Sequence, residues 1–254
     1  MIGDATWIFP IFCVWALIGA FTFLSLFGIV APYGRHRRGG WGPEIPARLG
    51  WVIMEVPSPL LLVLLFVFSG RQDFLSYGVV SLWVFHYFYR SFLYPFWAKM
   101  GGKKMPLSVA LMAIVFNIMN AGFNGLTLFY WLPAQDVTWS TMGVLPGLGL
   151  VLFGVGFIIH FHSDRVLWGL RSDGSTGYKV PMKGVHQWVA APNYLGESIQ
   201  WLGLALFANN LACWSFWLWT LSNLAPRARS NLTWYRDKFP DYPQERKAFL
   251  PFIW

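Results

Sequence analysis

Charged residues are scarce in this chain. Asp, Glu, Lys and Arg together make up 12% of its 254 residues, whereas an average soluble domain is about 25% charged. Hydrophobic residues make up 56%, so a soluble globule of this length would lack the polar residues to cover its surface. Cysteine is also scarce: Cys13 and Cys213 both lie in apolar runs, where we expect buried free thiols. These shortages exclude intrinsic disorder, a soluble α/β enzyme and a secreted disulfide scaffold.

Aromatic residues and long apolar segments are abundant instead. The 16 Trp and 23 Phe suit a chain that crosses two membrane–water interfaces. A spanning helix needs about 20 mainly apolar residues, and seven segments qualify: 7–31, 47–69, 74–98, 106–132, 143–168, 187–208 and 210–225. We therefore expect one all-α domain over residues 1–254, with seven transmembrane helices and a polar tail at 226–254. The sixth and seventh segments meet at Asn209 and Asn210, which predicts a tight helical hairpin.

The basic residues are distributed unevenly between the two sides of this arrangement. All but two of the 19 Lys and Arg residues fall in the first, third and fifth loops and in the tail; the exceptions are Arg71 and Arg90. This bias places the C-terminus in the cytoplasm and the N-terminus outside or in the lumen. It fits a bacterial inner membrane as well as the endoplasmic reticulum. Because the cations lie between apolar segments, their distribution also argues against nucleic acid as a partner.

Ionisable residues inside the predicted spans are candidates for function, because burying them in a bilayer is costly. Glu55 lies about two turns into the second span. In the third span, Tyr87, Arg90, Ser91 and Tyr94 share one helical face, and Tyr87 lies at a depth similar to that of Glu55. Either Glu55 and Tyr87 reach the same substrate oxygen, or Glu55 pairs with Arg90 and only holds two helices together. We expect His86 to be structural.

Three further segments carry polar or small residues at helical spacing. One stripe is formed by Asn117, Asn120 and Asn124, and a second by Asn193, Glu197 and Gln200. The first is either interhelical glue or a cavity wall, and the second predicts a polar pocket open to the cytoplasm. His160 and Asp164 share a face from which His162 is turned away, so no metal site is expected. The glycines between Gly147 and Gly156 predict close helix packing rather than a dinucleotide-binding loop.

Taken together, the polar segments resemble the steroid 5α-reductase family of membrane enzymes. The matching pieces run in order from residue 32 to the C-terminus: Pro32-Tyr-Gly-Arg-His36, Glu55-Val-Pro-Ser58, His86-Tyr-Phe-Tyr-Arg90 with Tyr94, His162-Ser-Asp164, Arg171, Tyr178, Ala191-Pro-Asn-Tyr-Leu-Gly-Glu197, Arg227-Ala228, Tyr235, Asp241-Tyr-Pro243, Arg246-Lys-Ala248 and Pro251-Phe-Ile253. The resemblance implies reduction of the 4,5 double bond of a 3-oxo-Δ4 steroid with NADPH.

The resemblance also implies roles for individual residues. Glu55 and Tyr87 would bind the 3-oxo group as catalytic residues. The cofactor would be held at its nicotinamide end by Asn193 and Glu197, at its ribose or adenine by Asp164, Tyr178 and Tyr235, and at its phosphates by Arg35, Arg171 and Arg227, with further contacts from Arg90, Tyr94 and Asn231. Met54, Asn120 and Asn124 would line the substrate cavity. Met54 departs from the family pattern, which often has Gln at this position.

Other functions remain open at this stage. An isoprenylcysteine-type methyltransferase would use S-adenosylmethionine, and a transporter or lipid receptor would use the polar cavity without chemistry. A related reductase that acts on another enone lipid is the alternative most similar to a steroid 5α-reductase. The expected partners are a steroid or enone lipid and the membrane lipids, and nothing in the sequence predicts a protein partner.

Overall fold

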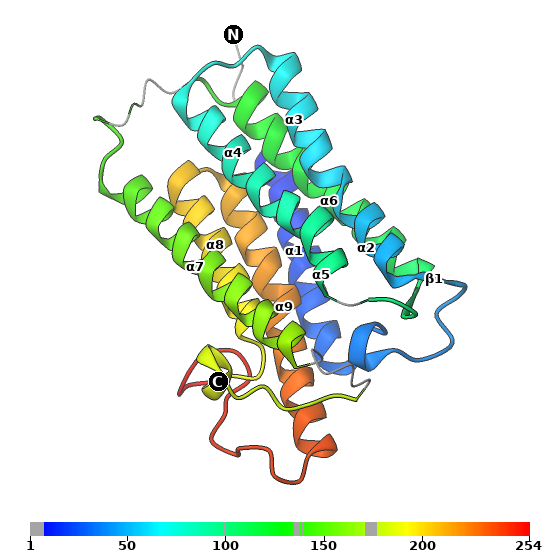
Figure 1. The fold of residues 1–254 in the computed structure, drawn as a ribbon. Helices are drawn as coiled ribbons and strands as arrows, with labels where there is room; N and C mark the ends of the chain where they lie inside the picture. Colours follow the sequence, from blue (N-terminus) through cyan, green and yellow to red (C-terminus); the bar gives the residue numbers. More distant parts are fainter. Residues whose placement is uncertain (1–7, 99, 135–137, 139, 171–176) are drawn as a thin grey trace.

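The computed structural model describes all residues except 1–7, 99, 135–137, 139 and 171–176. The described chain is mostly helical, as expected (Figure 1). Its elements are α1 (Ile8–Gly28), η2 (Gly34–His36), β1 (Glu44–Pro46), α2 (Ala47–Glu55), α3 (Pro57–Ser69), α4 (Phe74–Phe88), η3 (Tyr89–Leu93), α5 (Tyr94–Trp97), β2 (Lys104–Pro106), α6 (Leu107–Leu126), η4 (Thr127–Trp131), α7 (Val144–Gly169), η5 (Gly184–Gln187), α8 (Pro192–Ala208) and α9 (Leu211–Lys238).

The helix ends follow local side-chain chemistry. Asp73 caps α4, since its carboxylate accepts the backbone N–H of Ser76 at 2.9 Å. Asn210 caps α9 by accepting the N–H of Cys213 at 3.0 Å. The preceding Asn209 ends α8 with φ of 40°, a left-handed conformation that Asn tolerates better than most residues. The predicted hairpin between residues 208 and 211 is therefore confirmed.

Two of the predicted segments are interrupted helices. Segment 47–69 consists of α2 and α3, which meet at Val56 just before Pro57; proline lacks the N–H that would continue the helical bonding. Segment 74–98 consists of α4, the π-helical turn η3 and α5. Within the part of the chain that the structure describes, four helices are long and apolar enough to cross a membrane: Phe9–Gly28, Ala47–Ser69, Leu107–Trp131 and Val144–Gly169. The count of seven spans stays a prediction.

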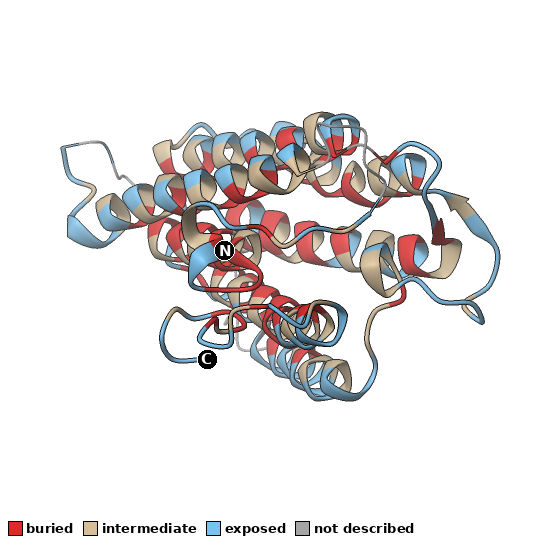
Figure 2. Ribbon diagram, turned by 60° about the horizontal axis from the view of Figure 1, so that its bottom comes forward, coloured by how far each residue is buried: buried red, intermediate tan, exposed pale blue. Residues whose placement is uncertain are grey.

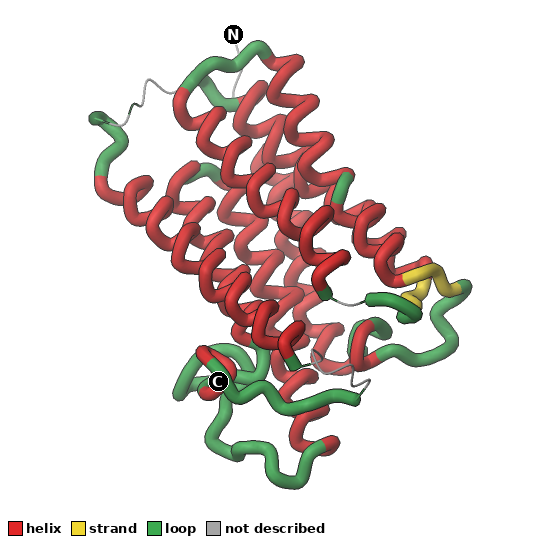
Figure 3. The backbone as a smooth tube through the Cα atoms, viewed as in Figure 1, coloured by secondary structure: helices red, strands yellow, loops and turns green. Residues whose placement is uncertain are grey.

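The last helix continues beyond its predicted span. α9 extends to Lys238, although Pro226 lies inside it. The first half of the predicted tail is thus helical, and irregular structure begins only at Phe239. Backbone hydrogen bonds from Ala190 N to Lys247 O and from Lys247 N to Trp188 O, both 2.9 Å, tie the remaining tail to the segment before α8. Figure 3 shows these loops gathered at one end of the bundle.

α7 and α8 are in close backbone contact through glycines. A Cβ built on Gly156 would lie 2.6 Å from the carbonyl oxygen of Gly196, and one built on Gly149 would lie 2.6 Å from that of Gly203. Only glycine permits such an approach. The predicted packing role is confirmed for Gly149 and Gly156, whereas Gly154 faces open space.

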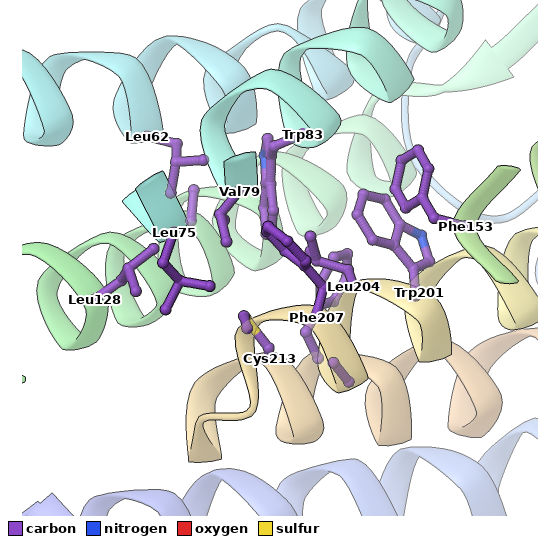
Figure 4. Close-up of a cluster of buried hydrophobic side chains, with 14 of the residues drawn as sticks. Leu62, Leu75, Val79, Trp83, Leu128, Phe153, Trp201, Leu204, Phe207 and Cys213 are labelled. Carbon is purple, nitrogen blue, oxygen red and sulfur yellow. The ribbon is translucent and has the colours of Figure 1, made fainter. Parts of the chain in front are cut away.

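The core lies between α3, α4, α8 and α9 (Figure 4). Trp83 and Trp201 have ring centroids 5.3 Å apart, and Phe216 packs against both. The outer surface is apolar as well: Phe21 is 72% and Phe68 79% exposed, and exposed residues cover the outside of the helices in Figure 2. Such a surface suits lipid contact. Cys213 is buried as expected, but Cys13 is exposed on the outer face of α1, so that expectation was wrong.

Candidate active site

A cluster of ionisable groups lies between α2, η3 and α8. Arg90 Nη2 approaches Glu55 Oε1 at 3.4 Å, and Arg90 also interacts electrostatically with Glu197. The side chains of Glu55, Arg90 and Glu197 keep 11%, 14% and 16% of their exposure, so all three are largely buried but none is completely enclosed. The Glu55–Arg90 pair expected on the structural interpretation is therefore present, but it is shared with a second carboxylate.

Tyr87 lies beside Glu55, close enough to interact with it electrostatically. The Tyr87 hydroxyl donates to Asn117 Oδ1 at 3.2 Å, and the Asn117 amide donates to the backbone carbonyl of Met54 at 2.6 Å. Met54 is itself buried. Asn117 thus connects the helix of Tyr87 to the turn that carries Glu55. Glu55 and Tyr87 are therefore neighbours, while their joint role at a substrate oxygen stays a prediction.

His86 lies on the side of α4 that faces α8. Its Nδ1 is 3.1 Å from Gln200 Oε1, and its Nε2 is 3.9 Å from Glu197 Oε1. The ring packs on Trp201 with centroids 4.4 Å apart. His86 therefore holds Gln200 and Glu197 relative to the core, as its predicted structural role requires.

Asp164 is a buried acceptor that several elements share. It accepts from the Tyr89 hydroxyl at 2.7 Å and from Asn193 Nδ2 at 3.2 Å, and His160 Nε2 lies 3.3 Å away. The structure thus joins Asp164 to Asn193, two residues expected at the cofactor. His162 lies against Gly184 instead. Among the described residues, no three His, Cys, Asp or Glu side chains are arranged to hold a metal ion.

Arg35 is surrounded by aromatic rings near the end of α9. Its guanidinium carbon lies 4.5 Å from the ring centroid of Tyr235, 5.0 Å from Trp234 and 5.9 Å from Tyr178. Three predicted cofactor residues therefore meet here. Arg35 Nη1 is buried and has no hydrogen-bond partner among the described residues. A buried charged donor of this kind is suited to an anionic or other acceptor ligand.

Arg227 and Asn231 extend this cluster along α9. Arg227 stacks over Tyr33 at 4.5 Å and donates to the Tyr194 hydroxyl at 3.0 Å. Asn231 Oδ1 is 3.1 Å from His36 Nε2. Burial lowers the pKa of His36, and the nearby Arg35 and Arg227 charges lower that pKa further, so the ring is neutral at physiological pH.

The remaining predicted residues occupy other positions. The ring of Tyr94 lies 5.0 Å from the Arg90 guanidinium. Asn124 donates to Asn120 Oδ1 at 3.2 Å, which leaves Asn120 Nδ2 and Asn124 Oδ1 buried without partners among the described residues. Arg171 lies outside the described residues. Two hollows are separate from these groups, one at the two-stranded β1–β2 sheet and one between α1 and α6.

Two residues of the site were missed by the sequence analysis. Tyr89 is the first residue of the π turn η3. Regular helical spacing separates Tyr89 from Tyr87 by about 200°, so Tyr87 faces Asn117 on α6 while Tyr89 faces Asp164 on α7, and both side chains are buried. Trp234 lies next to Tyr235 and beneath Arg35. Its only signal was its adjacency to a motif residue.

The chain is similar to known proteins over most of its length. A sequence profile of the family described as 3-oxo-5-alpha-steroid 4-dehydrogenase matches residues 103–254. The chain is 38% identical over 243 residues to steroid 5-alpha-reductase DET2 of Gossypium hirsutum, covering 92% of each protein. It is 34% identical over 241 residues to 3-oxo-5-alpha-steroid 4-dehydrogenase 1 of Bos taurus, covering 93% of each, and 35% identical over 224 residues to the Homo sapiens protein of that name, covering 87% of this chain and 85% of that one.

Proposed function

The chain belongs to the 3-oxo-5-alpha-steroid 4-dehydrogenase family, and on this basis we propose that it reduces the 4,5 double bond of 3-oxo-Δ4 steroids with NADPH. Its membership makes it an oxidoreductase of steroid metabolism with apolar helices suited to a membrane. The family assignment favours this reaction over methyl transfer and over a transporter or lipid receptor. The observation that carries the residue assignment is the buried grouping of Glu55, Tyr87 and Asn117.

Glu55 and Tyr87 are the proposed donors to the 3-oxo oxygen. A protonated carboxyl and a phenol can both donate hydrogen bonds. Negative charge develops on that oxygen as the enone is reduced, and donors held in a dry site stabilise it. Arg90 contacts Glu55 at 3.4 Å, which is longer than the charge-assisted bonds of about 2.7–2.9 Å that would fix the carboxylate. In this proposal the 3-oxo oxygen of the substrate replaces Asn117 Oδ1 as the acceptor of the hydrogen bond from the Tyr87 hydroxyl.

The rest of the steroid would lie along α6. Asn120 and Asn124 follow Asn117 at successive turns, and both retain an unpaired buried polar atom. Met54 adds apolar lining near the ketone. The substrate range then depends on Met54, because its thioether offers no strong hydrogen bond to the Glu55 carboxyl or to the steroid.

The residues near Arg35 fit a nicotinamide dinucleotide phosphate. The unpaired Arg35 Nη1 suits a phosphate, and the rings of Tyr178, Trp234 and Tyr235 suit an adenine. Asp164 and Asn193 would bind ribose and nicotinamide groups, with Glu197, Arg90 and Tyr94 closer to the ketone. Arg227, Asn231 and Arg171 would complete the binding site. When bound, NADPH supplies the hydride for the reaction.

The test is a reaction with purified full-length protein in detergent or nanodiscs. Testosterone or progesterone is incubated with NADPH, absorbance at 340 nm is followed, and the product is identified by mass spectrometry. We expect a product that is two mass units heavier and has the 5α configuration. Absence of turnover across several 3-oxo-Δ4 steroids would remove the proposal, while turnover of a non-steroidal enone alone would narrow it to a related reductase.

A further inference from the structure

A separate hollow is lined by residues of α2, α5, the two-stranded β1–β2 sheet and the segment that connects α5 to β2. Its volume is about 580 Å³, within the range of roughly 300–1,000 Å³ that small-molecule sites occupy. None of the residues assigned above to the steroid or the cofactor lines it. It therefore requires its own explanation.

One rim of the hollow is basic. Arg48, Lys103 and Lys104 line it, and the lining contains no acidic residue. Strand pairing sets Lys104 opposite Pro46, directly before α2, and Arg48 is held by a bond to Pro95 O at 3.3 Å. The nearby Glu44 is engaged by Arg37 through bonds of 2.7 and 2.6 Å, so it offsets the charge of the rim only weakly.

The rest of the hollow's lining is apolar, and the hollow continues onto the outer surface. Leu49, Val52, Phe96 and Met100 line it. Leu49 is 51% and Phe96 55% exposed, so the hollow opens along the face of the bundle that suits lipid contact. A small soluble anion would bind to the cations alone and would leave the apolar lining without a partner. Basic residues beside an apolar lining match an amphiphile that has an anionic head and a hydrocarbon chain.

We propose that this hollow binds an anionic phospholipid of the surrounding membrane. The phosphate lies at Arg48, Lys103 and Lys104, and an acyl chain runs over Leu49 and Phe96. The glycines at 101 and 102 leave the rim open, since a Cβ at either position meets nothing within 4 Å. The inference does not depend on the steroid reaction, because it concerns different residues and a different ligand.

The first test is native mass spectrometry of the purified full-length protein titrated with phosphatidylglycerol or phosphatidylcholine. We expect one phosphatidylglycerol to bind at least ten-fold more tightly than phosphatidylcholine. Each cation near an anionic headgroup contributes about five-fold to binding, so Lys103→Gln with Lys104→Gln should weaken phosphatidylglycerol binding about 25-fold. The matched control, Lys183→Gln with Lys238→Gln, removes the same charge from exposed positions elsewhere and should have no such effect.

A second pair of variants tests whether the lipid occupies the hollow. Gly101→Trp adds a large ring at the rim without a backbone clash and should abolish the tight site, whereas Gly39→Trp, also in open space, should leave it intact. Equal affinity for the two lipids, an equal loss in the charge control, or insensitivity to Gly101→Trp would overturn the proposal. Competition by soluble glycerol phosphate as strong as that by the lipid would also overturn it, because the site would then bind free phosphate.

Discussion

Glu55 occupies a position in which a structural and a catalytic role make different demands. As a structural residue it would need only its contact with Arg90. Yet Arg90 interacts with Glu197 as well, and its 3.4 Å approach to Glu55 is loose for a supporting ion pair. Tyr87 and Asn117 surround the same carboxyl. The catalytic role that we propose for Glu55 accounts for this arrangement, and it predicts how conservative variants behave.

Glu55→Gln should lose most of its turnover while NADPH binding is preserved. The amide is a weaker donor than a carboxylic acid and cannot release a proton, and losing an effective oxyanion donor costs about 10²–10³ in rate. Tyr87→Phe should behave similarly. The measurements are kcat with testosterone and NADPH binding by fluorescence. Glu44→Gln is the control, because Glu44 lies in an exposed pair with Arg37 and should keep normal kcat. Near-normal turnover in both Glu55→Gln and Tyr87→Phe would leave them as structural residues.

Arg35→Ala should reduce the preference for NADPH over NADH. The two cofactors differ by one phosphate, and a hydrogen bond to a charged group is worth about 1.5–3 kcal/mol. We therefore expect NADPH to bind roughly 10–150-fold more weakly, with NADH and steroid affinity little changed. Arg38→Ala is the control in the same loop, since Arg38 is exposed and lies over Trp41. An unchanged NADPH-to-NADH ratio in Arg35→Ala would assign the phosphate to other residues, and Arg171→Ala would then be tested next.

Residue spacing predicted part of this site and missed another part. The regular rise of a helix placed Glu55 and Tyr87 at similar depths without any tertiary information. Tyr89 was missed because it lies on the opposite face of that helix from Tyr87, and the sequence does not show that α7, which carries Asp164, covers this face. The meeting of Arg35 with Tyr178 and Tyr235 was expected only from the family resemblance, since these residues lie far apart in the chain and no local rule brings them together.

Among the elements, α7 and α8 form the tightest pair because their glycines allow backbone contact. The sequence indicated packing by glycines in α7 but not which of them face α8. Gly149 and Gly156 are seven residues apart, as are their partners Gly203 and Gly196, so each pair repeats after about two turns. This contact holds Asp164 on α7 beside Asn193 on α8.

Gly156→Ala should therefore destabilise the protein, whereas Gly154→Ala on the same helix should not. The new methyl at residue 156 would lie 2.6 Å from the Gly196 carbonyl oxygen, and overpacking of this kind costs about 1–3 kcal/mol. At residue 154 it meets nothing within 4 Å, and alanine favours a helix by up to about 1 kcal/mol. Thermal unfolding in detergent measures both variants. Equal midpoints would show that the helices separate without cost.

The sequence predicts a helix end where a capping residue is present, but not where tertiary packing determines how far the helix extends. Asn209 and Asn210 marked the α8–α9 turn in advance. The end of α9 did not follow from hydropathy, because residues beyond 225 are polar yet remain helical through contacts made by Ala228 and Tyr235. Hydropathy indicates where the apolar part of a helix ends, but the backbone hydrogen bonds of the helix can continue beyond that residue.

For the whole molecule, the distribution of cations predicts seven spans and a cytoplasmic C-terminus. Arg71, an exception to this distribution, donates to the carbonyl oxygens of Phe129 and Leu132 at the end of η4, so it has a local structural task. A fluorescent protein fused after Trp254 should fold and fluoresce, whereas alkaline phosphatase at that position should be inactive. Alkaline phosphatase inserted after Gly70 should be active. The reverse pattern would contradict the orientation.

The most direct test of the account follows the hydride itself. NADPH carrying deuterium at the transferable position of C4 is incubated with the purified protein and progesterone, and the product is examined by mass spectrometry and NMR. The account predicts a 5α-reduced steroid with a single deuterium at C5 on the α face, and loss of this product in Glu55→Gln. Deuterium absent from the product, or located at a carbon other than C5, would contradict it.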